Sequence, residues 1–214
     1  MSMVKIRAAL EVALAAMGEL IPSVAILKST AGNPAVITTS VPHGLKTDVS
    51  VNLVDHSVAT LNGTYLINVL SPNSFSLRNR VTETAIASTA SGTGGVCKPN
   101  LTAWDNVSFK PVPGLPYQKV NLLFAEPDDI TMGAGYYRDH GFMQVSLYYP
   151  IYLGTLGITS RADLIRSTFS RGTSFEHDGV TVKILRTPMV MTGLPVDESY
   201  AIPIRIQFQA DIFK

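Results

Sequence analysis

The sequence contains a single cysteine, Cys97, among its 214 residues. One cysteine cannot form a disulfide within the chain, and it cannot by itself make a cysteine-rich zinc site. No neighbouring motif activates its thiol, so we interpret Cys97 as a buried or bystander side chain. The shortage of cysteine favours a reducing compartment.

Charged residues are also scarce, because they make up 15% of the chain and leave a formal net charge of +1. A nucleic-acid-binding surface usually needs concentrated basic charge, and this composition shows none. No uncharged apolar segment approaches the ~18 to 20 residues of a membrane helix. Glu11 interrupts the N-terminal apolar run where a signal peptide would be continuous. We therefore expect a soluble cytoplasmic protein.

Hydrophobic residues are plentiful at 46%, which is ample for a packed core. The clearest pattern lies in residues 202–213, where apolar side chains alternate with Arg205, Gln207, Gln209 and Asp211. A period of two residues predicts a half-buried strand. Such a strand needs sheet partners and an apolar cover over its Ile/Phe face.

Two helices are predicted to supply that cover. Residues 3–21 repeat apolar side chains at spacings of three and four, up to Pro22. Residues 160–170 open with Ser160 and Asp163, a pattern that resembles a capping box. The sheet itself is predicted from strands at residues 104–110, 118–126, 141–149 and 202–213 and a hairpin at residues 173–186. These elements predict an α+β fold, an antiparallel sheet covered by two helices.

Residues 24–98 have a different character. Turn pairs such as Asn62-Gly63 separate short predicted strands at residues 24–28, 34–39, 48–54, 64–70 and 74–78. Residues 82–95 are rich in Ser, Thr and Gly, which is typical of a return linker. We therefore predict an inserted all-β module at residues 24–98, within a body made of residues 1–23 and 99–214.

The histidines do not form a catalytic or metal-binding set in the sequence. His43, His56, His140 and His177 all fall at predicted turns, where a histidine is usually solvated. No two of them have the i, i+4 spacing of a helical zinc site. The sequence therefore predicts neither an enzyme nor a bound metal or cofactor.

Two charged groups remain as candidates for binding. Glu126, Asp128 and Asp129 form an acidic loop, but a calcium loop needs more oxygen ligands in a defined order. We interpret this loop as solvated or as part of a subunit contact. Arginines on or beside the second predicted helix are interpreted as a solvated face, because no interleaved aromatics accompany them as nucleic-acid binding would require; they are Arg161, Arg166 and Arg171.

The body resembles a bacteriophage tail terminator. The resemblance rests on an ordered series of segments: residues 104–109 (WDNVSF), 123–129 (LFAEPDD), 141–145 (GFMQV) and 179–185 (GVTVKIL). It runs through the N-terminal helix and from about residue 101 to residue 213. The insert is similar to a small β module embedded in various phage tail and virion proteins, and compact terminators lack it; its segments are residues 42–45 (PHGL), 61–65 (LNGTY) and 74–77 (SFSL).

This resemblance implies a structural virion protein of the neck region, assembled in the host cytoplasm. Members of this family form a ring, typically of six subunits, that caps the head-proximal end of the tail tube, stops its growth and faces the head connector. The implied partners are further copies of the chain, the tail tube protein, the connector proteins and genome DNA that passes through the lumen without specific binding. No membrane is implied.

A closed ring needs two different complementary surfaces on each subunit. We expect the acidic loop of Glu126, Asp128 and Asp129 to face Arg138 or Arg161 of a neighbour. The polar row of Arg205, Gln207 and Gln209, with Asp211, either lines the lumen or forms a subunit contact. Mixed charge and neutral amides favour the lumen, because a DNA channel should neither grip nor strongly repel phosphate.

Three alternatives remain open from the sequence. The protein could be another neck, connector or tail decoration subunit with the β module as its working part. It could be a carbohydrate-binding, adhesin-like module, as the β insert and Tyr136, Tyr137, Tyr148 and Tyr149 suggest. An enzyme is the third alternative.

Overall fold

A computed structural model describes residues 2–131 and 135–213 of the chain. The chain forms two compact units, which are described separately below. One comprises Met1–Gly18, Thr102–Phe109 and Pro116–Lys214, and the other comprises Glu19–Leu101 and Lys110–Leu115. That the second unit is an inserted domain with its own folding stability stays a prediction.

The second unit contains a closed six-stranded antiparallel barrel with strand order β1-β2-β5-β4-β3-β6. Closure leaves no open sheet edge that could pair with another chain. The five predicted strands are confirmed, but the sequence missed β6, a short strand that ends in proline and closes the barrel against β1 and β3. The elements are β1 (Val24–Ser29), β2 (Val36–Thr39), β3 (Ser50–Val54), the 3-10 helix η1 (Ala59–Leu61), β4 (Gly63–Ser71), β5 (Ser74–Arg78) and β6 (Val96–Pro99).

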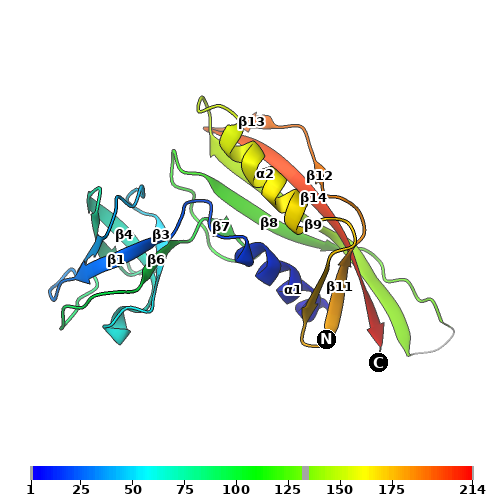
Figure 1. The fold of residues 1–214 in the computed structure, drawn as a ribbon, viewed down its shortest axis with the longest axis horizontal. Coiled ribbons are helices and arrows are strands. Elements are labelled where there is room, and N and C mark those ends of the chain that lie inside the picture. Colours follow the sequence, from blue (N-terminus) through cyan, green and yellow to red (C-terminus); the bar gives the residue numbers. More distant parts are fainter. Residues whose placement is uncertain (1, 132–134, 214) are drawn as a thin grey trace. The chain divides into compact units, whose positions relative to one another are not determined.

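The first unit is organised on an eight-stranded sheet with the order β10-β11-β14-β9-β8-β7, in which β12 and β13 also pair with β14. Figure 1 shows the two long strands β9 and β14 running through its centre. The strands are β7 (Thr102–Ala103), β8 (Tyr117–Phe124), β9 (Tyr136–Pro150), β10 (Ser174–His177), β11 (Val180–Ile184), β12 (Met189–Val190), β13 (Leu194–Val196) and β14 (Ser199–Phe213).

Strand β14 has the alternation that the sequence predicts. Its apolar residues at even positions from 202 to 212 are buried, and the polar residues between them are more exposed. Ile204, Ile206 and Phe208 are fully buried, and burial of side chains of this size contributes about 1.5–3 kcal/mol each. The strand pairs with β9 along its whole length, from Ser199 opposite Pro150 to Phe213 opposite Tyr136.

Both predicted helices are present, with different ends. Helix α1 (Ser2–Ala16) stops before the predicted end at residue 21, because Gly18 adopts the left-handed φ of +81° that terminates helices. Helix α2 (Leu156–Thr168) begins four residues before the predicted Ser160. The predicted strand at residues 104–110 is absent, since those residues form a turn in which Asn106 has a φ of +58°.

The predicted α+β fold, a sheet covered by two helices, is wrong. Strands make up 44% of the chain and helices 15%, so the protein is mostly β, with a closed barrel and a curled sheet. The helices do join the sheet core through residues such as Leu10 and Ile165. The fold class is wrong because the lengths of the strands are not visible in the sequence. Helix periodicity is easily recognised, whereas β9 begins at Tyr136, well before the apolar repeat that predicts a strand at residues 141–149.

Gly141 marks a close approach between strands at the centre of the sheet. It lies opposite Phe124 on β8 and opposite Phe208 on β14. A β carbon at this position would overlap the carbonyl oxygen of Leu123 and lie 3.1 Å from the Cα of Phe124. The rings of Phe124 and Phe208 pack edge to face, with centroids 5.7 Å apart. The sheet therefore requires glycine here.

We predict that Gly141→Ala lowers the free energy of unfolding by about 1–3 kcal/mol, because the added methyl group must push the backbone of β8 away. Denaturant unfolding followed by the fluorescence of Trp104, which packs against the same core, measures this loss. Gly135→Ala is the matched control, since its β carbon meets nothing within 4 Å. Equal stability losses in the two variants would contradict this account of Gly141.

Candidate functional site

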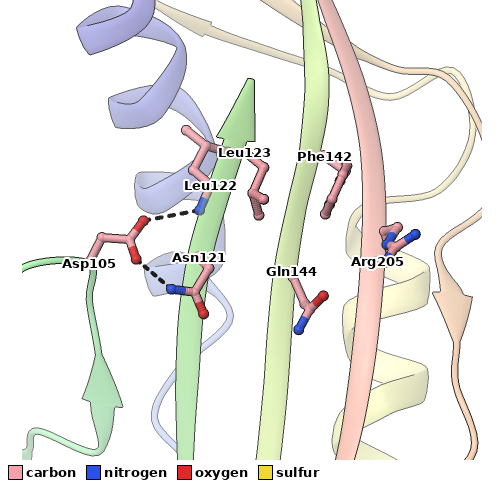
Figure 2. Close-up of a pocket in the computed structure, with 7 residues that line it drawn as sticks. All are labelled: Asp105, Asn121, Leu122, Leu123, Phe142, Gln144 and Arg205. Atoms are coloured by element: carbon pink, nitrogen blue, oxygen red, sulfur yellow. Dashed lines mark hydrogen bonds between the residues drawn. The ribbon is translucent and has the colours of Figure 1, made fainter. Parts of the chain in front are cut away.

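A groove with a volume of about 440 Å³ lies on the outward face of the sheet, the face opposite the hydrophobic core (Figure 2). Strand register explains its composition. Asn121, Gln144 and Arg205 lie opposite one another on β8, β9 and β14, and Leu123 and Phe142 form the next row. We call this the sheet groove; its lining residues are Asp105, Asn121, Leu122, Leu123, Phe142, Gln144 and Arg205.

Arg205 forms the β14 wall of the sheet groove. Its guanidinium carbon lies 4.4 Å from the centroid of the Phe142 ring, a cation–π contact. Among the residues that the structure describes, Arg205 has no carboxylate within ion-pair distance. Its positive charge is therefore available to a partner that enters the groove.

Asp105 fixes the opposite wall of the groove, as the dashed lines in Figure 2 show. Its carboxylate accepts a hydrogen bond from the backbone N–H of Leu122 at 3.1 Å and from Nδ2 of Asn121 at 2.6 Å. The guanidinium of Arg7 on α1 approaches the same carboxylate at 3.3 Å. Asp105 thus stands in for a strand partner along the edge of β8 and joins that edge to α1. The sequence offered no signal for this role.

The acidic residues predicted at a subunit contact lie in an exposed segment between β8 and β9. Glu126, Asp128 and Asp129 are all exposed. Asp128 pairs through its backbone with Arg138 of the same chain, and its carboxylate lies 3.5 Å from Nδ1 of His140. The structure does not test whether this segment faces a neighbouring subunit, so that role stays a prediction.

The two arginines predicted as partners of the acidic loop have contacts within their own subunit. Arg138 donates from Nε to Asp211 at 2.7 Å and from Nη2 to the hydroxyl of Tyr136. Arg161 is 7% exposed and donates to the carbonyl oxygen of Gly18 at 3.0 Å. Its aliphatic stem and charge therefore lie inside the first unit. The periodicity of α2 could not show this, because nothing in the sequence places Gly18 beside that helix.

Asp211, Arg138 and Tyr136 form a small network at the outer ends of β9 and β14. The hydrogen bond from Arg138, and then that from Tyr136, lowers the pKa of Asp211 below its ordinary value of 3.8. The folded carboxyl group therefore stays charged to lower pH than the unfolded one. Ionised Asp211 therefore stabilises the folded protein at pH values above 3.8, and this stabilisation is lost as the pH falls from 3.8 through the lower pKa of the folded state.

The predicted lumen residues lie where the strand pattern expects them. Arg205, Gln207 and Gln209 occupy the outward face of β14, with side chains that are intermediate or exposed. Only Arg205 belongs to the sheet groove. The structure describes one chain, so whether any of the three lines a channel stays a prediction.

The end of the sheet opposite the network of Arg138 and Asp211 is apolar and exposed. This surface was not among those predicted from the sequence. Tyr152, Leu153 and Leu156, in the loop between β9 and α2 and at the start of α2, are 96%, 77% and 81% exposed. Ser199 of β14 pairs with Val196 on one edge and with Pro150 on the other, so β13 and the end of β9 flank β14 at this end of the sheet, and β13 adds further exposed apolar side chains. We call this surface the apolar end; its residues are Tyr152, Leu153, Leu156, Leu194 and Val196.

Two of the histidines predicted to be solvated are instead buried in the second unit. The Nδ1 atoms of His43 and His56 accept hydrogen bonds from the backbone N–H groups of Leu45 and Val58, two residues further along the chain. Nε2 of His43 lies 3.1 Å from the carbonyl oxygen of Ser71 and, with Nδ1 accepting, must donate to it. These side chains hold turns in place, which accounts for their position in the sequence.

Within residues 2–131 and 135–213, no group of three or more His, Cys, Asp or Glu side chains could hold a metal ion. No helix among these residues combines the length and apolar character needed to cross a membrane. What the described part of the chain does offer is a mostly β subunit with a groove, a charged network and an apolar end on one sheet. Surfaces of this kind are typical of proteins that contact other proteins.

The chain belongs to the phage tail terminator family, because a family model described as "Phage tail terminator protein" matches residues 77–208. The resemblance read from the sequence is therefore confirmed, although the match does not extend to the N-terminal helix. This is a family of structural proteins rather than enzymes, and the chain is a structural component of the virion tail.

No curated protein matches the chain. One solved structure is 20% identical to this chain, over 53% of this chain and 80% of its own, with a TM-score of 0.44. A likeness of that size supports no argument about this protein.

Cys97 provides a test of the barrel core. Burial raises the pKa of its thiol to about 12, compared with an ordinary value of 9.0. We predict that native protein near neutral pH does not react with a thiol reagent and that denatured protein reacts fully, since the thiolate is the reactive form. Rapid reaction of the native protein would contradict the barrel packing.

The raised pKa of Cys97 also predicts that the free energy of unfolding falls as the pH rises from about 9 towards 12, because only the unfolded thiol ionises in this range.

Proposed function

We propose that the protein is the ring-forming terminator of a phage tail. In this proposal a homohexameric ring caps the head-proximal end of the tail tube, stops its polymerisation and presents a surface to the head connector. The observation that supports the proposal most is the family match over residues 77–208. The subunit would join the virion neck after folding in the host cytoplasm, without a cofactor and without enzymatic activity.

The geometry of the sheet supports a ring. A closed ring is held together by two different surfaces on each subunit, which meet head to tail. The β9–β14 ladder is fifteen residues long, which corresponds to about 45 Å at the rise of a β-strand. It separates the apolar end from the network of Arg138 and Asp211. Each subunit therefore presents chemically different surfaces that its neighbours and the tube can use.

The polar face of β14 is divided between two roles in this proposal. Gln207 and Gln209 line the lumen through which genome DNA passes, since neutral amides neither grip nor repel phosphate. Arg205 instead belongs to a subunit contact, because it stacks on Phe142 in a partly apolar groove. A subunit contact was the alternative that the sequence left open for this strand.

The acidic segment of Glu126, Asp128 and Asp129 remains a proposed contact with a neighbouring protein. It is exposed and lies directly after β8, beside the groove residue Leu123. Arg161 is not retained as its partner in the proposal, since that side chain is buried within its own subunit, whereas the partly exposed Arg138 remains a candidate partner.

An adhesin-like function receives no support from the tyrosines that suggested it. Successive side chains of a strand point to opposite faces. Tyr137 and Tyr149 pack against the core, whereas Tyr148 stacks on Tyr117 on the outward face, with centroids 4.5 Å apart. Tyr136 donates a hydrogen bond to Asp211. The four side chains therefore do not share one sugar-binding platform.

We predict that the protein, added to growing tail tubes, stops their elongation at one end. The reason is that a ring bound to the terminal subunits covers the surface to which the next tube subunits would add. Tube growth followed by light scattering, with tube lengths from electron micrographs, measures the effect. Unchanged growth would contradict termination. Binding along the tube wall would support a tail decoration protein instead.

We also predict that Asp128→Lys combined with Asp129→Lys raises the protein concentration needed for half-maximal ring assembly by about tenfold or more, since reversed charge at a contact is repulsive. Ring mass by light scattering measures the shift. The matched control carries Asp163→Lys and Glu176→Lys, the same charge change at exposed positions outside the segment. Unchanged assembly of the Asp128/Asp129 variant would remove this segment from the interface.

A further inference from the structure

The apolar end has two unfavourable features in the isolated subunit, exposed apolar side chains and a strained backbone at Tyr152. Tyr152 is 96% exposed, and its backbone has a φ of +67°, a left-handed conformation that is strained for an aromatic residue. Leu153 and Leu156 beside it are almost as exposed. Contiguous exposed apolar surface and local strain are both typical of a site that is completed by a partner.

The sheet groove has the chemistry to receive this surface. Leu123 and Phe142 provide an apolar floor, and the amides of Asn121 and Gln144 lie beside them. A tyrosine suits such a groove because its ring is apolar while its hydroxyl group needs a hydrogen-bond partner. A volume of about 440 Å³ falls within the range of cavities that bind whole ligands, so it can accommodate more than one side chain.

The charges around the two surfaces are complementary. Asp197 and Glu198, in the turn between β13 and β14, adjoin the apolar end, since the carbonyl oxygen of Glu198 accepts a hydrogen bond from the N–H of Ile151. Across the described residues, neither carboxylate is in an ion pair, and the guanidinium of Arg205 in the groove is not in one either. Negative charge beside one surface thus matches unpaired positive charge in the other.

The two surfaces cannot meet within one subunit. Gln144 in the groove and Pro150 at the apolar end are six residues apart on the same strand, or about 20 Å. Tyr152, two residues beyond Pro150, is exposed to solvent rather than folded back. A contact between the apolar end and the groove therefore joins two molecules.

We propose that the loop of residues 151–156 of one subunit inserts Tyr152 and Leu153 into the sheet groove of a second copy, with Asp197 and Glu198 facing Arg205. This inference rests on the ring of the proposed function and specifies its subunit contact. Because the inserted loop and the groove are different surfaces, the contact is head to tail, and repetition by rotation closes a ring.

Disulfide trapping tests the contact. A variant with Tyr152→Cys and Leu123→Cys should, on oxidation of assembled protein, give a ladder of covalent oligomers on non-reducing gels, since every subunit then joins two neighbours. Either single variant cannot extend beyond a covalent dimer. Native Cys97 is buried and contributes no background. The matched control combines Leu123→Cys with Phe213→Cys, which is 77% exposed at the opposite end of β14 and should give no ladder.

Further outcomes separate this inference from the proposed function. Rings of the Tyr152/Leu123 variant that yield no ladder would overturn the inference and leave the ring intact, as would a ladder of equal yield from the Phe213 control. Trapping of Tyr152→Cys on the tail tube protein instead would also overturn it. Absence of rings from the unmodified protein, both alone and on tubes, would contradict the proposed function itself.

Tyr152→Asp, at a side chain with no folding role, should raise the concentration for half-maximal assembly by about tenfold or more.

Discussion

The fifteen-residue antiparallel pairing of β9 with β14 is the interaction on which the first unit depends. It fixes which residues of both strands face the hydrophobic core and which face outward, because a slip of one residue would exchange the two faces of either strand. The inward face holds Ile204, Ile206 and Phe208 against α1 and α2. The outward face brings Gln144 and Arg205 together as a wall of the sheet groove.

The same pairing positions the surfaces that we assign to assembly. A twisted two-strand ladder in the middle of a larger sheet is stiff, so the apolar end and the Arg138–Asp211 network are held at a set separation. In a ring this lets one subunit meet its neighbour and the tail tube at independent places. A tube end also holds subunits at high effective concentration, so a contact that is weak in solution can still close on its template.

Sequence periodicity predicted the parts of the fold whose partners are apolar and regular. The alternation in residues 202–213 identified β14 and its buried face, and turn pairs such as Asn62-Gly63 located five of the six strands of the barrel. It failed where tertiary contacts decide the outcome. Gly18 ends α1 early, and β9 continues beyond its apolar repeat to Tyr136. Longer strands and a shorter helix contribute to a fold that is mostly β rather than α+β.

The candidate site was less predictable than the fold for a related reason. The sheet groove is formed by rows across three strands, of which β14 is far in the sequence from β8 and β9, and the register between strands cannot be read from any one of them. Arg161 shows the same difficulty, because the backbone of Gly18, to which it donates a hydrogen bond, is 143 residues away. The exposed run around Tyr152 did carry a sequence signal, an uncharged apolar segment directly after the proline that closes β9, and it could have been recognised as a contact surface.

The most direct test of the account is an electron cryomicroscopy reconstruction of tail tubes assembled in the presence of the protein. The account predicts a single closed ring at one tube end, in which the sheet groove contacts the adjacent subunit and Tyr152 is covered. Protein distributed along the tube wall, or a terminal ring in which Tyr152 and Arg205 both face solvent, would contradict it.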